Sequence, residues 1–303
     1  MNSNTGMFSD QGPGHDKECL HKMFPLNDAV IKRVQVPREV TSPLYSDKYV
    51  RVNSNCFELK VPGTGAFFAC DGNMAEYSIE PGADPEWVRL YLKGQVLVAL
   101  LHQRKIINFH ASSFVYSGRG VMILGETGAG KSSLTASFAL EGAGFLTDDI
   151  TPVVYSDGDP LIWSLHEVIR IRRSTALQLN IDASVLREAE AGTGKQYMKV
   201  KHAGVSQFPL DVIIKIEVGD TDVPLFDQPL PADRFSFLRS EICLSDLLAG
   251  MPGTERSYLL QLLLIVEKVH FVRVVRPSEI RIKELHRLVS EYLHKSLDRR
   301  RSR

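Results

Sequence analysis

The sequence lacks the features that mark a disulfide-bonded, metal-binding or membrane-spanning protein. Its four cysteines, Cys19, Cys56, Cys70 and Cys243, form no C-x-x-C pair or other metal-ligand spacing, which favours scattered thiols in a reducing compartment. The longest apolar stretches, such as Val96–Leu101, are far too short to cross a bilayer. The polar first residues contain no apolar segment of the kind that defines a secretory signal. We therefore expect a cytoplasmic protein.

There is also no excess of charge of either sign. Lysine plus arginine and aspartate plus glutamate both number 36 among 303 residues, so nothing favours nucleic acid or a membrane surface as a partner. The local exception is Arg299–Arg303, which is either a solvated tail or a docking patch. With 44% hydrophobic and 24% charged residues, the composition is that of an ordinary globular protein with one large domain or two smaller ones.

Four segments differ in their patterning. Residues 1–45 have few apolar positions and several turn formers, and we expect them to be a mobile lead-in. Residues 46–105 begin with short alternating runs broken by PGTG and DGN, which predict a small β meander. Asp84 or Pro85 then opens a helix that continues to about Gln103. Residues 106–298 form the largest unit, and residues 299–303 are the basic tail.

Strands alternate with helices in the largest unit. Ala111–Tyr116 and Gly120–Leu124 are apolar runs with a short glycine-containing turn between them, which indicates a hairpin. A helix follows to about Glu141, and Pro277 is suited to open a terminal helix that extends from Ser278 to about Leu297. This alternation predicts α/β architecture. Further strands are expected at Phe145–Thr147, Pro152–Tyr155, Asp211–Val218 and Val269–Val275.

The segment between the hairpin and its helix is the most specific signal. Gly125–Ser132 reads GETGAGKS and fits the phosphate-loop pattern G-x-x-x-x-G-K-[ST], with an apolar strand before it and a helix after it. In this pattern glycines let backbone N–H groups surround phosphate oxygens, the lysine reaches the terminal phosphates and the serine hydroxyl binds magnesium. We therefore expect ATP with Mg²⁺ as the cofactor. The expected nucleotide-binding residues are Gly125, Glu126, Thr127, Gly128, Ala129, Gly130, Lys131, Ser132 and Ser133.

A phosphate loop does not name a reaction, and two acids and a histidine supply candidates for the chemistry. Asp148 and Asp149 follow a short strand seventeen residues after Lys131, where P-loop proteins often carry an acid that holds magnesium. One of two adjacent carboxylates can serve the metal while the other accepts a hydroxyl proton; either can instead cap a turn. If the hairpin closes around Gly118, His110 lies beside the phosphates, and a purely structural histidine is the alternative.

The stretch from His110 to Asp149 resembles the catalytic core of HPr kinase/phosphorylase and its relatives. It contains a histidine, a Gly-x-Gly before an apolar strand, a GxxGxGKS loop and a paired aspartate. The earlier meander is similar to the N-terminal part of HPr kinase-related kinases of peptide-modification clusters. The resemblance extends over about Tyr49–Leu297 and is specific in the forty-residue core. It implies a P-loop domain of the HPr kinase and phosphoenolpyruvate carboxykinase type, preceded by a small β-rich region.

The resemblance also implies a role for each candidate residue. Asp148 is expected to be the general base that deprotonates the acceptor hydroxyl, with Lys131 and His110 near the transferred phosphoryl group. Asp149 is expected to position His110 or to hold magnesium together with Ser132.

The chain departs from the family pattern at two points. Ser133 stands where the family has a glutamate directly after the P-loop serine, and the glycine-rich signature that follows the acid pair is not recognisable. Glu167, in about the right region, is the candidate for a further metal ligand. These departures weaken the implication that HPr itself is the substrate.

We therefore expect an ATP-dependent kinase that phosphorylates a hydroxyl of a peptide or protein, with serine favoured by the resemblance. The stretches Ile169–Leu179 and Lys195–Gly204 combine apolar and basic residues suited to an extended peptide, although a plain surface explains them equally. The alternative is a P-loop nucleotide-binding regulatory or assembly protein with weak or no hydrolysis. A GTPase is disfavoured because no N-K-x-D motif is present. A homo-oligomer is left open.

Overall fold

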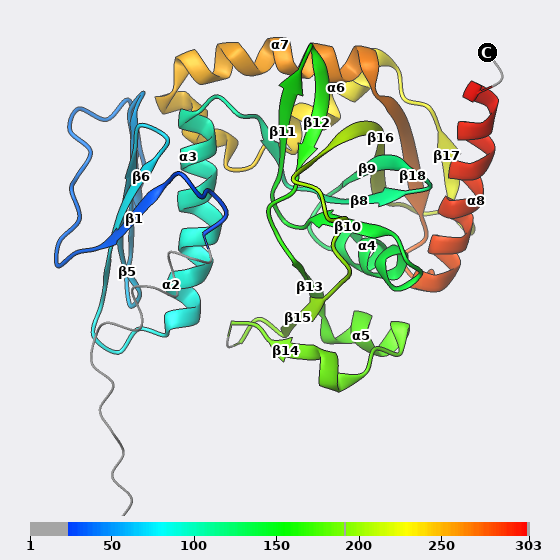
Figure 1. Ribbon diagram of the computed structural model, residues 1–303, viewed down its shortest axis with the longest axis horizontal. Coiled ribbons are helices and arrows are strands. Elements are labelled where there is room, and N and C mark those ends of the chain that lie inside the picture. Colours follow the sequence, from blue (N-terminus) through cyan, green and yellow to red (C-terminus); the bar gives the residue numbers. More distant parts are fainter. Residues whose placement is uncertain (1–23, 191, 302–303) are drawn as a thin grey trace, which may run out of the picture.

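The computed structural model describes residues 24–190 and 192–301. Figure 1 shows a smaller N-terminal sheet beside a larger sheet, with helix α7 running along the top of both and a third, small sheet below the larger one. The fold is therefore mixed α/β with a β-rich N-terminal region, as the sequence predicted.

The N-terminal sheet has the strand order β1-β6-β5-β4-β3-β2. The alternating runs of the sequence form its antiparallel meander, in which β4 pairs with β5 and β5 with β6. Cys56 and Cys70 are opposite each other in the first of these pairs. The strands are β1 (Val30–Arg33), β2 (Tyr45–Ser46), β3 (Val50–Val52), β4 (Cys56–Val61), β5 (Gly65–Cys70) and β6 (Met74–Ile79).

The mobile lead-in expected over residues 1–45 is wrong for its second half. Phe24, Leu26 and Ala29 are buried in the N-terminal core, and β1 lies parallel to β6. The few apolar side chains of this segment gather against residues far along the chain, and composition alone cannot reveal such a long-range contact. Residues 1–23 lie outside the described residues.

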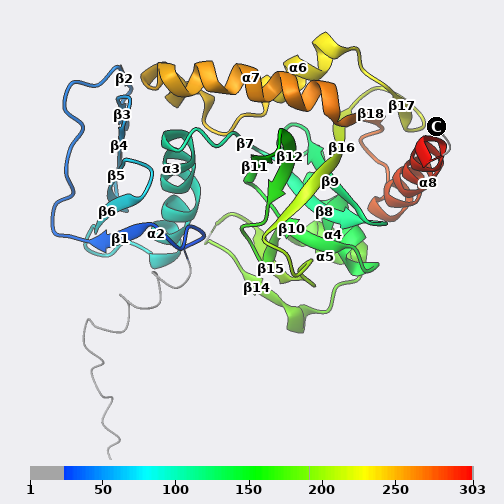
Figure 2. The same cartoon turned by 45° about the horizontal axis from the view of Figure 1, so that its top comes forward.

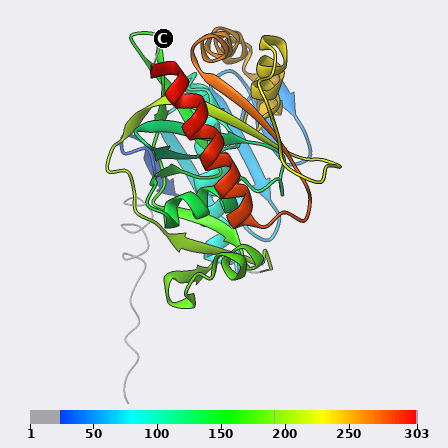
Figure 3. The same cartoon turned by 90° about the vertical axis from the view of Figure 1, so that its right-hand side faces the viewer.

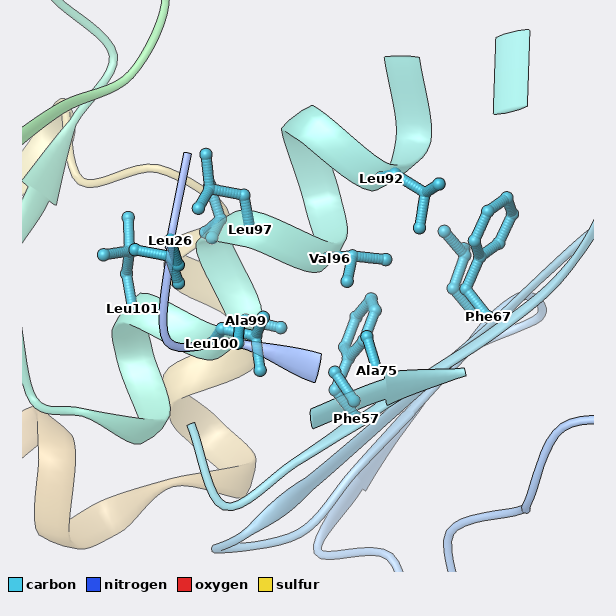
Figure 4. Close-up of a cluster of buried hydrophobic side chains, with 14 of the residues drawn as sticks. Leu26, Phe57, Phe67, Ala75, Leu92, Val96, Leu97, Ala99, Leu100 and Leu101 are labelled. Atoms are coloured by element: carbon cyan, nitrogen blue, oxygen red, sulfur yellow. The ribbon is translucent and has the colours of Figure 1, made fainter. Parts of the chain in front are cut away.

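A helical segment covers one face of the N-terminal sheet. The Asp84 carboxylate caps its start by accepting a hydrogen bond from the Glu86 amide at 2.9 Å, as predicted. Figure 4 shows Phe57 and Phe67 of the sheet facing Val96 of this segment. The segment comprises α2 (Pro85–Tyr91), a π-helical turn η1 (Leu92–Val96) and α3 (Leu97–Gln103).

The larger sheet is built around β9 (Arg119–Leu124), the strand that leads into the glycine-rich loop. On one side β8 (Ser112–Tyr116) forms the predicted antiparallel hairpin, and on the other side β16 (Gln207–Val218) is parallel. Strand β18 (His270–Arg276) lies parallel beyond β16. The other strands are β7 (Asn108–Phe109), β10 (Gly144–Thr147), β11 (Thr151–Ser156), β12 (Asp159–Trp163) and β17 (Leu225–Asp227).

Helices cover both faces of this sheet. Strand side chains alternate between faces, and on β9 both alternating pairs, Val121 with Ile123 and Met122 with Leu124, are fully buried. The first pair packs in a cluster with α4 and α8, and the second in a cluster with α6, η3 and α7. Figure 3 shows α8 lying across its face of the sheet. The helices are α4 (Lys131–Leu140), α6 (Pro231–Ser240), η3 (Ser245–Gly250), α7 (Pro252–Lys268) and α8 (Ile282–Arg301).

Helix α7 connects the two larger sheets, and Figure 2 shows it running from one to the other. Its Tyr258 hydroxyl donates to the carbonyl oxygen of Ile106 at 2.7 Å and lies 2.8 Å from Nδ1 of His102 on α3. Thr254 Oγ1 donates to the His102 carbonyl at 3.0 Å. Among the described residues, none of the helices is long and apolar enough to cross a membrane.

The small third sheet was not predicted as a unit. Its strands are antiparallel, with β15 between β13 and β14, and Figure 1 places it below the larger sheet. Its elements are β13 (Val168–Arg172), α5 (Arg173–Leu179), the 3₁₀ turn η2 (Ala183–Val185), β14 (Leu186–Glu188) and β15 (Lys195–Lys199).

The terminal helix begins later and ends later than expected. It starts at Ile282 and not at Ser278, because the carbonyls of Pro277 and Ser278 accept hydrogen bonds from Nη1 of Arg276 at 2.8 and 3.2 Å and the segment forms a turn. The helix continues to Arg301, into the expected basic tail of residues 299–303. Residues 302–303 of that tail lie outside the described residues.

Candidate phosphate-binding and catalytic site

The Gly125–Ser132 loop leaves the end of β9 and enters the first turn of α4. Gly125 has a φ of 151°, and a Cβ there would lie 2.4 Å from the carbonyl oxygen of Ile216, so glycine is required beside β16. Gly130 precedes α4 with a φ of 110°. The loop therefore ends at a helix N-terminus, where backbone amides and the helix dipole favour an anion.

The Lys131 side chain is folded back on its own loop. It is 7% exposed, and its Nζ donates to the carbonyl oxygens of Gly125 and Glu126. Burial lowers the pKa of its ammonium group, and the nearby Glu241 and Asp149 carboxylates oppose that shift. A buried cation that is satisfied by backbone carbonyls can exchange them for phosphate oxygens.

Asp148, just past β10, is tied to the last residue of the loop. Its Oδ1 accepts a hydrogen bond from Ser132 Oγ at 2.9 Å, and its Oδ2 accepts one from the Arg170 amide at 3.1 Å. The residue is 4% exposed. Burial, followed by the charge of Asp149, raises the pKa of Asp148 to about 6, while hydrogen bonds from Arg170 and Ser132 oppose the rise. Asp148 is thus in contact with the hydroxyl that was expected to bind magnesium.

Asp149 faces the open space in front of the loop. Its φ of 67° is in the left-handed region, which ends the extended run of β10. Its carboxylate is 42% exposed and lies 3.7 Å from Nε2 of His110 and 3.6 Å from Nη1 of Arg170. Burial lowers the pKa of His110, Lys131 lowers it further, and Asp149 opposes both. Burial thus favours the neutral imidazole, which can accept a hydrogen bond.

The hairpin register explains where His110 lies. Ser112 is opposite Ile123, so His110 comes level with the start of the loop. Its backbone amide donates to the carbonyl of Glu241 at 2.7 Å, and the Glu241 carboxylate pairs with Lys215 at 2.7 Å in the interior. This position matches the one expected from the sequence, while the catalytic role of His110 stays a prediction.

The small third sheet brings a buried charge pair to the loop, for which no individual role was predicted from the sequence. Arg170 pairs with Glu190, which is 2% exposed and accepts a further hydrogen bond from the Tyr197 hydroxyl at 2.6 Å. Ser133 Oγ and Thr175 Oγ1 lie 2.8 Å apart and join α4 to α5. No local pattern in the sequence could show that this sheet faces the loop.

Arg276 braces the loop from the end of β18. Its Nε donates to the carbonyl oxygen of Ala129 at 2.9 Å, and its Nη2 donates to that of Gly128 at 3.4 Å. A guanidinium group fixed on two carbonyls of the loop restrains the peptide units that carry the loop amides. The predicted strand ended at Val275, and no local pattern marked Arg276.

One cleft of about 320 Å³ joins these groups. Among the predicted catalytic and metal-binding residues it brings together His110, Lys131, Ser132 and Asp149, whereas Asp148 does not line it. The predicted acceptor-binding stretches also reach it. They contribute Arg170, Ile171, Arg172, Ser174, Thr175, Gln178 and Lys195.

The predicted third metal ligand is not brought to the cleft. Glu167 directly precedes β13, where it is exposed to solvent and does not line the cleft. No group of three or more His, Cys, Asp or Glu residues that could hold a metal occurs in residues 24–190 and 192–301. Magnesium usually takes one or two carboxylates together with phosphate oxygens and water, and the Ser132 and Asp148 oxygens fit that donor set.

Comparisons with known proteins add distant structural likeness and no match in sequence. No protein-family model matches the chain, and no curated protein matches it in sequence. Among solved structures, the HPr(Ser) kinase/phosphatase from Coxiella burnetii aligns with a TM-score of 0.34 and 15% identity, over 64% of this chain and 95% of that one. The chain is thus distantly similar in structure to that protein, and a likeness at this level assigns no activity.

Proposed function

We propose that this protein is an ATP- and magnesium-dependent phosphotransferase that acts on a hydroxyl group of a peptide or protein. The observation that carries the proposal is the convergence of Asp149 and His110, 3.7 Å apart, at the mouth of the Gly125–Ser132 loop. A nucleotide bound by that loop has its terminal phosphate at the same end of the sheet. Phosphoryl transfer requires a base and charge neutralisation at this place.

In the proposed reaction the acceptor oxygen attacks the γ-phosphorus, the bond to the β–γ bridging oxygen breaks, and the acceptor proton passes to a carboxylate. Lys131 and Arg170 neutralise the developing charge on the phosphate oxygens. Ser132 and Asp148 would hold magnesium, which when bound would supply further neutralisation of the phosphate charge. His110 accepts a hydrogen bond from the incoming hydroxyl or from Asp149 once it is protonated.

The geometry favours Asp149 over Asp148 as the base. A general base must come within hydrogen-bonding distance of the proton that it removes. Both oxygens of Asp148 are already engaged, one by Ser132 and one by the Arg170 amide. Asp149 is the carboxylate that lines the cleft. This division of roles exchanges the two assignments implied by the family resemblance.

The acceptor is inferred from the rest of the cleft wall. Arg172 and Lys195 add positive charge, and Ile171 adds an apolar contact on the same side. Such a wall suits an extended peptide segment with polar and acidic groups near its hydroxyl. A serine is the acceptor that the family resemblance favours.

A transfer assay with γ-labelled ATP, magnesium and candidate peptides encoded beside the gene tests the proposal. We expect label in a peptide product for the wild type and a loss of roughly 10²–10⁴-fold for Asp149→Asn, the usual worth of a general base. Both Asp148→Asn and Asp149→Asn should retain nucleotide, which titration calorimetry measures. Undiminished transfer by Asp149→Asn with loss in Asp148→Asn would restore Asp148 as the base.

The second candidate is a nucleotide-binding regulatory or assembly protein. The small third sheet favours it, since Ser133 and Thr175 couple that sheet to the first turn of α4 and would report nucleotide to the surface. ATP binding without labelled product from peptides, sugars or nucleosides supports this candidate and excludes the kinase. Label in a small molecule alone leaves a kinase with a different acceptor.

A further inference from the structure

A second cleft, of about 570 Å³, lies in the N-terminal half of the molecule. Strands β2 to β4 form one wall, the α2–η1 helical segment another and the η3 turn a third. It shares no lining residue with the cleft at the glycine-rich loop. The floor is apolar, because Phe57, Leu59 and Leu247 are buried side chains at its base. The volume is within the usual range of ligand-binding clefts.

The rim of this cleft carries two carboxylates and no basic residue among its lining residues. Asp47 is fixed in place, because its Oδ1 accepts hydrogen bonds from the amides of Tyr49 and Val50, both at 2.7 Å. Asp246 lies in the first turn of η3 on the opposite wall. Both carboxylates are exposed, so each can meet a ligand at the water boundary.

Three tyrosines complete the walls. Tyr91 is held against Phe67, with ring centroids 5.7 Å apart, and Tyr45 and Tyr49 stand on the strand side. The Nζ of Lys48 already rests 4.9 Å from the centre of the Tyr49 ring, although Lys48 does not line the cleft. Aromatic faces beside carboxylates attract cations through the ring quadrupole as well as through charge.

We propose that this cleft binds the side chain of an arginine or a lysine that belongs to a peptide or protein partner. The methylene stem of such a side chain lies on the apolar floor, and its charged head stays at the wet rim beside Asp47 and Asp246. The rim is open where Asp47, Tyr49 and Asp246 are exposed, which leaves room for the chain that carries the side chain. The inference is independent of phosphoryl transfer.

Titration of the full-length protein with three probes tests the proposal. The probes are the peptides acetyl-Leu-Arg-Leu-amide and acetyl-Leu-norleucine-Leu-amide, and free butylguanidine. At roughly 50 mM salt, where surface charges are only partly screened, we expect the arginine peptide to bind about 10-fold more tightly than the norleucine peptide. Butylguanidine should bind more weakly than the arginine peptide, since it lacks the flanking chain.

Matched variants locate the binding. Asp246→Asn should abolish the preference for arginine, and Tyr49→Leu should weaken binding of the arginine peptide, both with melting temperatures close to wild type. Asp222→Asn, which changes an exposed carboxylate outside the cleft, should leave the preference intact. Equal binding of arginine and norleucine peptides, no binding of either at millimolar concentration, or a preference that survives Asp246→Asn overturns the proposal. If butylguanidine binds as tightly as the arginine peptide, the proposal that the ligand is part of a peptide is wrong.

Discussion

Lys131 is a charged side chain in a place where charge is costly. The side chain is almost entirely buried, and this burial lowers the pKa of its ammonium group. It packs little apolar surface and donates to two carbonyls of its own loop. We expect Lys131→Ala to keep a melting temperature near that of wild type and to lose ATP–magnesium affinity by roughly 10- to 100-fold, the worth of one or two charge-assisted hydrogen bonds.

Titration calorimetry on both proteins measures this change. Lys283→Ala, which removes an exposed lysine of α8, is the matched control and should bind as wild type does. If the wild type binds no nucleoside triphosphate at millimolar concentration, the assignment of Gly125–Ser132 as a phosphate loop is wrong.

Asp148 carries a cost of a different kind. Burial raises its pKa to about 6, from 3.8 in the unfolded chain. A raised acid contributes stability that is fully present below the unfolded pKa and is lost as the pH rises through the folded pKa. We therefore compare the melting temperature of Asp148→Asn with that of wild type in metal-free buffer. The difference, variant minus wild type, should be more positive at pH 8 than at pH 4 by a few degrees.

Calorimetric scans at the two pH values, with chelator present, provide the measurement. Asp220→Asn removes an exposed carboxylate outside the loop region and should show no such difference between pH 4 and pH 8. A variant that is equally destabilised at both pH values would contradict the raised pKa, because it would show that the hydrogen bonds of Asp148 to Ser132 and Arg170 balance its desolvation.

At the scale of elements, the sequence predicted those that local patterns define. Periodicity predicts the hairpin of β8 and β9, and capping predicts the start of the α2 helical segment near Asp84. Motif spacing predicts the helix after the glycine-rich loop. Their positions needed no knowledge of distant residues. The same holds for the meander, whose runs are separated by turn residues.

Helices α6 and α7 were not predicted, because tertiary contacts and not a regular apolar pattern determine which of their side chains are buried. Helix α7 carries exposed leucines, among them Leu260 and Leu263, so its apolar positions do not fall on one face. Helix α6 buries only Leu238. The site shows the same limit. Arg276 contacts the loop and Arg170 contacts Asp149, and they come from strands that follow the loop by nearly 150 and about forty residues. The spacing of neighbouring residues cannot predict contacts between segments so far apart in the sequence.

Arg276 shows how one element holds another. Its guanidinium joins the end of β18 to the carbonyls of Ala129 and Gly128. We expect Arg276→Met to weaken ATP–magnesium binding by roughly 10- to 30-fold, because the loop loses two hydrogen-bonded restraints that together contribute up to about 2 kcal/mol. Hydrogen exchange of the loop amides in the nucleotide-free protein should become faster, which a residue acting only on bound nucleotide would not cause. Unchanged exchange with weaker binding contradicts the bracing role.

At the scale of the whole molecule, the N-terminal sheet shares its core with the rest of the chain. Ile150, Leu247 and Met251 are buried in the same cluster as the helical segment that covers that sheet. A segment cut at residues 46–105 therefore leaves part of its own core behind. The chain is expected to unfold with the two larger sheets coupled, and α7 is the element that joins them.

The contact between α3 and α7 contains a buried histidine, which should make the protein sensitive to acid. His102 is fully buried between α3 and α7, with Nδ1 2.8 Å from the Tyr258 hydroxyl and Nε2 2.9 Å from the Cys243 carbonyl. Burial lowers its pKa to about 4, and hydrogen bonding to backbone opposes the shift. The unfolded chain then binds more protons between pH 6.5 and 4, so stability present above pH 6.5 is lost as the pH falls through about 4.

A lowering from 6.5 to about 4 corresponds to roughly 3 kcal/mol for this one group. His166 shares the effect, since burial also lowers its pKa to about 4. His102→Gln keeps a hydrogen-bonding side chain that cannot titrate, so it should be less stable at pH 7 and lose less melting temperature on acidification to pH 4.5. Calorimetric scans of wild type, His102→Gln and the exposed control His294→Gln measure the three slopes. An acid slope in His102→Gln equal to that of wild type would mean that His166 alone, or the carboxylates, governs acid unfolding.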